Sequence, residues 1–351
     1  MKKFFSLILA ILMVLSLTAC AGKPVQEEPK LPQEPETSEP AEEIEENGNY
    51  YPLTLVDQAG RSVMIETKPE KLVSGYYIST SALIALGVKD QLVGIEAKAD
   101  KRPIYALSAP ELIALPNVGT AKEFDMEGCI ALEPDLVILP LKLKSVVETL
   151  EEMGIAVLLV DPETQEGLEE MVTLLGDATN TSERAKELLS FIDGQETVLK
   201  AVSAETPTVY MAGNSSLLST AGTGMYQSDM IELAGGKNAA AEITDSYWVD
   251  VSYEQLLAWD PDYIVIASDA SYSVEDVLSD PNLAGLSAVV NGKVCQMPNK
   301  AEAWDSPVPG GILGSVWLAS ILHGEDISEE QRDTVIDEFY ETFYGFTYSE
   351  K

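Results

Sequence analysis

Two segments of 15 residues, at residues 124–138 and 251–265, share one sequence pattern. In each copy a Glu is followed seven residues later by Pro-Asp and an apolar run. Glu127 and Glu254 hold equivalent positions, and the offset between the copies is 254 − 127 = 127 residues throughout. Each copy reads as a short helix that carries the Glu, stops at the Pro and leads into a buried strand. The repeat therefore predicts two similar α/β lobes.

Apolar runs and glycine stops elsewhere predict the other elements of these lobes. Predicted strands lie at residues 71–74, 91–95, 136–139, 156–160, 208–211, 263–267 and 293–297, and predicted helices at 80–86, 144–153, 226–234 and 310–322. Alternating strands and helices favour mostly parallel sheets with helices on both faces, as in Rossmann-like folds. Residues 181–203 have helical spacing interrupted only by Gly194, which predicts one long helix between the lobes. The expected domains are residues 50–180, an inter-lobe helix at 181–204, and residues 205–351.

The N-terminal residues 1–20 have the pattern of a targeting signal. Lys2 and Lys3 precede an apolar run at residues 4–17, which is shorter than the roughly 20 residues of a membrane span. The run ends in Leu-Thr-Ala-Cys20, which resembles a bacterial lipobox and predicts a lipidated Cys20. An ordinary secretory signal with an incidental Cys20 is the alternative. We expect the mature protein to be exported and anchored by lipid to the outer face of the cytoplasmic membrane.

The next segment, residues 21–49, is rich in Glu and Pro and is expected to be a disordered, acidic tether. The whole chain has 58 acidic and 22 basic residues, a formal charge of −36. Such a charge repels phosphate backbones and anionic headgroups, so it disfavours nucleic-acid binding and electrostatic membrane docking.

Few residues in this chain suit catalysis or metal binding. His323 is the only histidine, and it falls near the end of a predicted helix, where a cation complements the helix dipole. Capture of bare Zn²⁺ or Mn²⁺ and a Ser-His-Asp mechanism are both disfavoured, so no metal site and no enzyme activity are expected. Cys129 and Cys295 are interpreted as buried small side chains, with a disulfide between the lobes as the alternative.

Several local sequences, taken with the repeat and the lipobox, carry a family resemblance. They are Lys-Leu-Val-Ser-Gly-Tyr-Tyr at 71–77, Asn-Val-Gly at 117–119 and Leu-Ala-Gly-Gly-Lys-Asn at 233–238. The chain resembles the substrate-binding lipoproteins of ABC importers for iron-siderophores, haem and cobalamin, in which a rigid helix joins two lobes. The resemblance implies a monomer that binds its ligand between the lobes. It also implies that Glu127 and Glu254 dock on Arg pockets of the permease, which works with an ATPase; the alternative is that both only complement helix dipoles.

The loops after the predicted strands supply candidate ligand contacts. Aromatic side chains gather there, and flat rings suit a large, partly apolar metal chelate. The candidates are Tyr76, Tyr77, Thr120, Lys142, Tyr226, Trp248, Trp304 and Asp305. Residues 303–310 resemble the cleft loop of iron-complex binders, although Asp305 or Ser306 would equally suit a helix N-cap. Gly222-Thr-Gly224 is interpreted as a tight turn rather than a phosphate loop, because the P-loop pattern is absent.

Charge and residue type narrow the expected ligand. Basic residues near the predicted cleft are sparse, chiefly Arg102, Lys122 and Lys142, which disfavours a highly anionic triscatecholate chelate. The sequence therefore predicts a neutral or weakly charged ferric siderophore, with no permanently bound cofactor. Cobalamin or haem, the latter held through a Tyr, is the first alternative. An oxyanion such as molybdate is the second.

Overall fold

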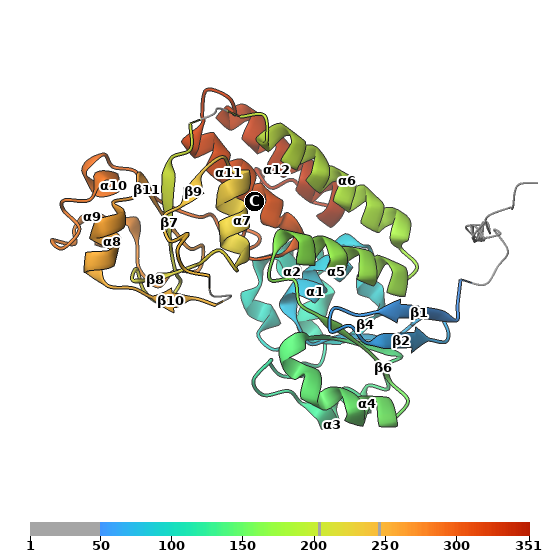
Figure 1. The fold of residues 1–351 in the computed structure, drawn as a ribbon. Coiled ribbons are helices and arrows are strands. Elements are labelled where there is room, and N and C mark those ends of the chain that lie inside the picture. The colour runs from blue at the N-terminus through green and yellow to red at the C-terminus, as the bar shows by residue number, and fades with distance from the viewer. Residues whose placement is uncertain (1–49, 203–204, 245–246) are drawn as a thin grey trace, which may run out of the picture. The chain divides into compact units, whose positions relative to one another are not determined.

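The protein is built around two β-sheets whose central strands are parallel (Figure 1). The computed structural model describes residues 50–202, 205–244 and 247–351, all within one compact unit, Asn49–Lys351. The predicted signal peptide, Cys20 and the tether lie outside the described residues. Within the described residues, no helix has both the length and the apolarity needed to cross a membrane.

The sheet of the first lobe has four strands in the order β4-β3-β5-β6, all parallel. They are β3 (Leu72–Ser74), β4 (Leu92–Ile95), β5 (Leu136–Pro140) and β6 (Ala156–Val160). Alternate residues of β5 face opposite sides: Val137 and Leu139 belong to one apolar cluster, Leu136 and Ile138 to another. Because helices cover both faces, these strands are continuous apolar runs, as the sequence predicted.

The helices of the first lobe divide between the two faces of its sheet. Cys129, Val147 and Leu150 of α3 and α4 pack on one face, whereas Leu83 of α1 and Leu168 of α5 pack on the other. The helices are α1 (Tyr77–Ala85), α2 (Pro103–Ser108), α3 (Met126–Ala131), α4 (Val147–Glu152) and α5 (Gln165–Ala178). Short 3₁₀ turns are η1 (Lys89–Gln91), η2 (Ala99–Lys101), η3 (Pro110–Ala114) and η4 (Leu141–Val146). The helix expected at 144–153 is therefore shorter than predicted: residues 144–146 belong to the end of η4, and regular α-helix runs only from Val147 to Glu152.

The second lobe repeats this plan. Its parallel strands follow the order β9-β7-β11-β12, which matches β4-β3-β5-β6, and two short antiparallel strands extend the sheet beside β7. The strands are β7 (Thr208–Ala212), β8 (Ser219–Thr220), β9 (Lys237–Asn238), β10 (Val249–Asp250), β11 (Tyr263–Ile266) and β12 (Val294–Gln296). The helices are α7 (Tyr226–Leu233), α8 (Tyr253–Trp259), α9 (Val274–Leu278) and α10 (Ser287–Val290). The expectation of two α/β lobes is confirmed.

The sequence repeat is also a repeat of local geometry. Asp125 caps α3 by accepting from Gly128 N at 2.9 Å, and Ser252, at the equivalent position, caps α8 by accepting from Gln255 N at 3.2 Å. After each helix a non-glycine residue takes a left-handed conformation, Glu133 with φ 48° and Asp260 with φ 41°. Asp260 then accepts hydrogen bonds from both the backbone and the hydroxyl of Ser287.

The Asp of each Pro-Asp pair binds the start of the neighbouring strand. Asp135 Oδ2 accepts from the backbone N–H groups of Glu70 and Lys71 at 2.8 and 2.9 Å, beside β3. Asp262 Oδ2 accepts from the backbone N–H and the hydroxyl of Thr208, both at 2.8 Å, beside β7. The repeated Asp therefore sets the register of the two central strands in each lobe.

A long helix, α6 (Ser182–Leu199), follows the first lobe, and the predicted inter-lobe helix is confirmed. Gly194 does not interrupt it. Residues 309–311 form η5 (Pro309–Gly311), which leads into α11 (Ile312–Leu322), and α12 (Glu329–Tyr344) follows. Figure 1 shows α12 beside α6, and the Arg184 guanidinium of α6 donates to the Thr342 carbonyl of α12. The end of the chain thus packs back onto the first lobe.

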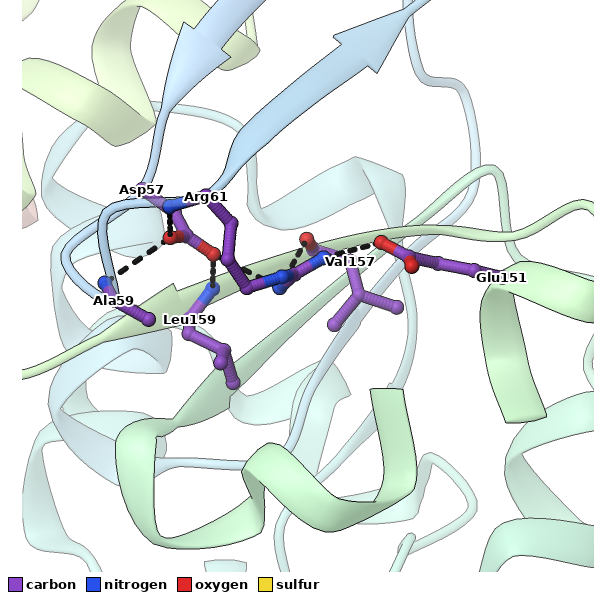
Figure 2. A network of polar contacts seen from close by, with 6 residues as sticks. All are labelled: Asp57, Ala59, Arg61, Glu151, Val157 and Leu159. Atoms are coloured by element: carbon purple, nitrogen blue, oxygen red, sulfur yellow. Dashed lines mark hydrogen bonds and ion pairs between the residues drawn. The ribbon is translucent and has the colours of Figure 1, made fainter. Parts of the chain in front are cut away.

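A β-hairpin covers the free edge of the first sheet. It comprises β1 (Leu53–Val56) and β2 (Ser62–Ile65), and its turn faces β6 in Figure 2. The buried Asp57 carboxylate accepts from Leu159 N at 3.1 Å, and the Arg61 guanidinium donates to the Val157 carbonyl at 3.4 Å and pairs with Glu151. Side chains here occupy the backbone groups that an added strand would use, which protects the edge from pairing with another chain.

The surroundings of Cys129, Cys295 and His323 suit a structural role. Cys129 is buried and Cys295 half-buried, and both are free thiols, so the structure does not support the disulfide alternative. His323 follows α11 and is buried, with Nε2 3.3 Å from the Gly235 carbonyl oxygen.

Candidate functional site

Loops at the carboxyl ends of the strands of both lobes meet around a cleft, where open α/β sheets place their ligands. At one end is a small cavity of about 120 Å³, which we call the Arg102 cavity. Tyr77 and Arg102 line it from the first lobe, and Asp269, Asn299 and Glu302 line it from the second.

At the other end is a larger cavity of about 600 Å³, which we call the acidic recess. Its first-lobe wall contains Lys142 together with four carboxylates, and Gly224 and Tyr247 close it from the second lobe. The carboxylates are Asp161, Glu163, Glu166 and Glu170. The side chain of Tyr247 is 61% exposed, so its ring is free to contact a ligand.

Tyr76 and Tyr77 follow β3, and their rings form an edge-to-face pair with centroids 5.4 Å apart. The Arg102 guanidinium lies 3.9 Å from the centre of the Tyr77 ring, a cation–π contact. Burial raises the pKa of both phenols.

The loop that carries Arg102 is braced by a buried carboxyl group. Glu96 follows β4 and accepts from the Thr80 hydroxyl at 2.7 Å and the Tyr105 hydroxyl at 2.6 Å. Burial raises the pKa of Glu96, and these two hydrogen bonds oppose the rise. The contacts join β4, α1 and α2, and so hold Arg102, the residue before α2, in place.

A second buried carboxyl group joins the lobes beside the Arg102 cavity. Glu302, from the loop after β12, accepts from the Ser81 hydroxyl of α1 and, at 3.4 Å, from the Tyr340 hydroxyl of α12. The Tyr344 hydroxyl is 2.8 Å from Ser81 Oγ. Burial raises the pKa of Glu302 to about 7, and the hydrogen bonds to Ser81, Tyr340 and Tyr344 oppose that rise.

The acidic recess holds two half-buried carboxylates that are not neutralised by contact. Within the described residues, the side chains of Asp161 and Glu163 make no hydrogen bond and no ion pair. Burial raises the pKa of both, and the charge of Lys142 opposes the rise. Lys142 Nζ instead lies 5.0 Å from the centre of the Tyr247 ring.

The structure brings only some of the predicted ligand contacts to the cleft. Tyr77 lines the Arg102 cavity and Lys142 lines the acidic recess. Tyr76 lies close enough to Asp161 and Glu163 that, besides burial, their charges raise the pKa of its phenol. Thr120 lies in a turn, where its hydroxyl accepts from Lys122 N and Glu123 N. Trp248 is half-buried and packs against Gly213.

Three other candidates are core residues. Trp304 is 1% exposed, and its Nε1 donates to the Tyr340 hydroxyl at 2.8 Å, because α12 covers this loop. Tyr226 is 2% exposed, with its hydroxyl against Gly311. Asp305 is 3% exposed and, instead of capping a helix, accepts from the backbone and hydroxyl of Ser268. These three side chains line neither cavity of the cleft.

Steric contact with a neighbouring segment explains why glycine occupies position 222 in the turn at residues 222–224. A Cβ on Gly222 would stand 2.5 Å from the Ile243 carbonyl oxygen, and Thr223 donates its backbone N–H to that oxygen at 2.8 Å. The interpretation as a tight turn is confirmed.

The two repeated glutamates are both exposed and lie in the first turn of α3 and α8. Hydrogen bonds from its own backbone N–H and from the Ser252 hydroxyl lower the pKa of Glu254. Glu127 and Glu254 therefore present exposed carboxyl side chains at equivalent positions of the two lobes, which is compatible with docking and equally with a helix-dipole role.

Sequence reasoning missed several cleft residues. Asp161 and Glu163 directly follow β6, and Glu302 follows β12, so position after a strand was the available signal. In a chain with 58 acidic residues, however, another carboxylate is not distinctive.

Two lobes with matching parallel sheets, one long helix and a cleft lined from both lobes define a two-lobed solute-binding protein. The chain belongs to the periplasmic binding protein family, whose model matches residues 72–301. It is thus the solute-binding protein of an ABC importer and acts outside the cytoplasm.

The proteins similar to this chain are named for different ligands. The molybdate-binding protein MolA of Haemophilus influenzae is 26% identical, covering 84% of this chain and 91% of MolA. Its molybdate-bound structure superposes with a TM-score of 0.74, covering 84% of this chain and 98% of that one. A cobalamin-binding protein of Halobacterium salinarum is 25% identical, covering 79% of this chain and 76% of the relative. The Fe(3+)-citrate-binding protein YfmC of Bacillus subtilis is 25% identical, covering 68% and 76%.

Proposed function

We propose that this protein captures a neutral or weakly cationic ferric chelate, such as a ferric hydroxamate siderophore, in the cleft between its lobes. The main observation in support of this proposal is the acidic recess. Its volume of about 600 Å³ is far larger than a bare ion requires, and exposed Tyr247 offers a ring face for an organic ligand.

The charge of the recess limits the class of chelate. Four carboxylates face one lysine there. At an effective dielectric constant near 20, two unit charges 6 Å apart interact by about 3 kcal/mol. A triply negative catecholate chelate would meet several such repulsions, whereas a neutral trihydroxamate would meet none.

Delivery to the importer is proposed to use Glu127 and Glu254. Their exposure, their equivalent helix positions and the offset of 127 residues support contact with a permease through both lobes. Exposed charges of this kind set the rate and orientation of encounter more than the affinity. Lipidation at Cys20 would keep the protein close to that permease.

A small oxyanion is the second candidate ligand. The Arg102 cavity, with Lys101 and Arg102 in its wall, has about 120 Å³, and MolA is named for molybdate. Asp269 and Glu302 in the same wall weigh against an anion, so we rank it below the chelate.

Binding of a ligand panel to the purified protein, without its signal peptide, tests the proposal. The panel contains a ferric trihydroxamate, a ferric triscatecholate, ferric citrate, cobalamin, haem and molybdate, and intrinsic fluorescence quenching reports binding. We expect the trihydroxamate to bind tightest and Tyr247→Ala to weaken it at least about tenfold. The matched control is Tyr263→Ala, which changes a tyrosine of β11 outside both cavities. Tightest binding of cobalamin, haem or molybdate would contradict the proposal and identify the alternative.

A further inference from the structure

We infer that Asp229 is a positioning residue of the cleft: through a hydrogen bond from one lobe to the other, it sets how far the empty cleft opens. Asp229 belongs to α7 of the second lobe, which lies next to α5 of the first lobe (Figure 1). Its Oδ2 accepts from the backbone N–H of Gln165, the first residue of α5, at 3.0 Å. Because this link acts in the ligand-free protein, it does not depend on which ligand the cleft captures.

The link joins the two segments that form the walls of the acidic recess. Asp161 and Glu163 line the first-lobe wall, and the segment that carries them leads directly into α5. Gly224 lines the second-lobe wall, two residues before α7 begins. Each wall therefore runs into a helix, and Asp229 holds the first turns of these two helices together. Loss of the link would let one wall of the recess move relative to the other.

The start of α5 explains why a carboxylate suits position 229. The first N–H groups of a helix have no partner within it, and a negative charge beside them is favoured by the helix dipole. Thr164 caps α5 from within the first lobe by accepting from Gly167 N at 3.0 Å. The Gln165 N–H is capped by Asp229 of the other lobe instead. Asp229 is half-buried; burial raises its pKa, and the hydrogen bond from Gln165 opposes this rise. The start of α5 is thus complete only while the lobes stay together.

The opposite end of the cleft has a link of its own. Ser81 of α1 donates to Glu302, from the loop after β12, and both residues line the Arg102 cavity. A cleft that is fastened at one end can still widen at the other, because one lobe can rotate about the fastened end. The bond between Asp229 and Gln165 fastens the end at the acidic recess. With both links in place, the cleft has a narrow range of widths.

Distances between the lobes of the ligand-free protein test this inference. Nitroxide labels at Glu148→Cys on α4 and Glu275→Cys on α9, both exposed positions, report the distance by pulsed electron paramagnetic resonance. The protein lacks residues 1–20 and carries Cys295→Ala, and Cys129 is buried from the label. We expect one narrow distribution for this parent protein. In Asp229→Ala the ratio of wide to narrow distances should rise at least about tenfold, because a hydrogen bond to a charged group is lost.

Asp229→Asn is the conservative variant. Its amide oxygen can still accept from the Gln165 N–H, so its distances should stay close to those of the parent protein. Glu232→Ala removes an exposed carboxylate from the same helix and should leave the distances unchanged.

Substitutions at position 165 remove the same bond from the donor side. Pro is well tolerated at the first position of a helix, because the missing N–H has no partner within the helix. Thr164 already has the extended backbone that a following Pro requires, with φ −130° and ψ 169°. Gln165→Pro should therefore widen the distances as Asp229→Ala does. Gln165→Ala keeps the N–H and should not.

Denaturant unfolding of each variant first shows that it is folded. If Asp229→Ala does not fold, Gln165→Pro decides the matter, with Gln165→Ala as its reference. Unchanged distances in the variants that lack the bond would overturn the inference. Equal widening by Asp229→Asn and Asp229→Ala, or by Gln165→Ala and Gln165→Pro, would also overturn it, because the effect would then not come from the hydrogen bond. None of these results bears on the proposed ferric chelate, since no ligand is present.

Discussion

Glu302 is a buried carboxyl group that links the lobes through Ser81 and Tyr340. Burial raises its pKa to about 7 from an ordinary value of 4.5. Below pH 4.5 the group is protonated in both the folded and the unfolded chain. As the pH rises from 4.5 to 7, the unfolded chain loses this proton first, so the free energy of unfolding falls by up to about 3 kcal/mol.

We predict that Glu302→Gln removes this pH dependence, because the amide stays neutral and keeps a hydrogen-bonding side chain of similar shape. Denaturant unfolding at pH 4.5 and pH 8 measures it. The variant should match the wild type at pH 4.5 and be more stable than it at pH 8. The exposed control Glu338→Gln on α12 should follow the wild type at both values. Equal stability of Glu302→Gln and the wild type at pH 8 would contradict the account.

At the scale of elements, the β1–β2 hairpin depends on one carboxylate. Asp57 accepts from Ala59 N, Arg61 N, the Arg61 guanidinium and Leu159 N, all between 2.9 and 3.1 Å. These bonds hold the hairpin against the edge of β6. Removing the carboxylate would leave the Leu159 N–H of β6 without its acceptor, and would leave the half-buried Arg61 guanidinium with only Glu151 and the Val157 carbonyl.

We therefore predict that Asp57→Ala destabilises the protein by about 2–4 kcal/mol and exposes the edge of β6. Thermal unfolding gives the stability, and light scattering after mild heating reports edge-to-edge association. Asp90→Ala, which removes an exposed carboxylate after α1, is the control and should change stability by less than about 0.5 kcal/mol. A similarly small effect of Asp57→Ala would show that the hairpin is held by other contacts.

Elements marked by strong local signals could be predicted from the sequence. The repeat located β5 and β11, and apolar runs located β6 and β7, because parallel strands are buried on both faces. The prediction did not include α12, although the capping box at Ser328 and apolar residues at helical spacing marked it. Nor did it include the hairpin, whose strands of four residues carry little pattern.

The cleft was less predictable than the fold. An aromatic residue in a loop after a strand indicated ligand contact, but the packing of α12 over Trp304 is a tertiary event with no local signal. Tyr77 and Lys142 line the cavities as expected of residues two or three positions after a strand that ends at the cleft, and their contact with a ligand stays a prediction. Asp161 and Glu163 line a recess that is completed by Gly224 and Tyr247 of the second lobe, which no local pattern around either carboxylate indicates.

At the scale of the whole molecule, the account is that one cleft captures a ferric chelate and two equivalent glutamates deliver it. Glu127 and Glu254 lie on α3 and α8 and line neither cavity of the cleft. We therefore expect capture and delivery to be separable by mutation.

Uptake of a radiolabelled ferric trihydroxamate, in cells that lack the chromosomal copy of this protein, tests the central claim most directly. The account predicts that the wild type restores uptake and that the Glu127→Arg/Glu254→Arg variant does not, although the purified variant binds the chelate as tightly as the wild type. A Glu148→Arg/Glu152→Arg variant on α4 controls for the change in charge and should restore uptake. Failure of the wild type to restore uptake, or full uptake with the docking variant, would contradict the account.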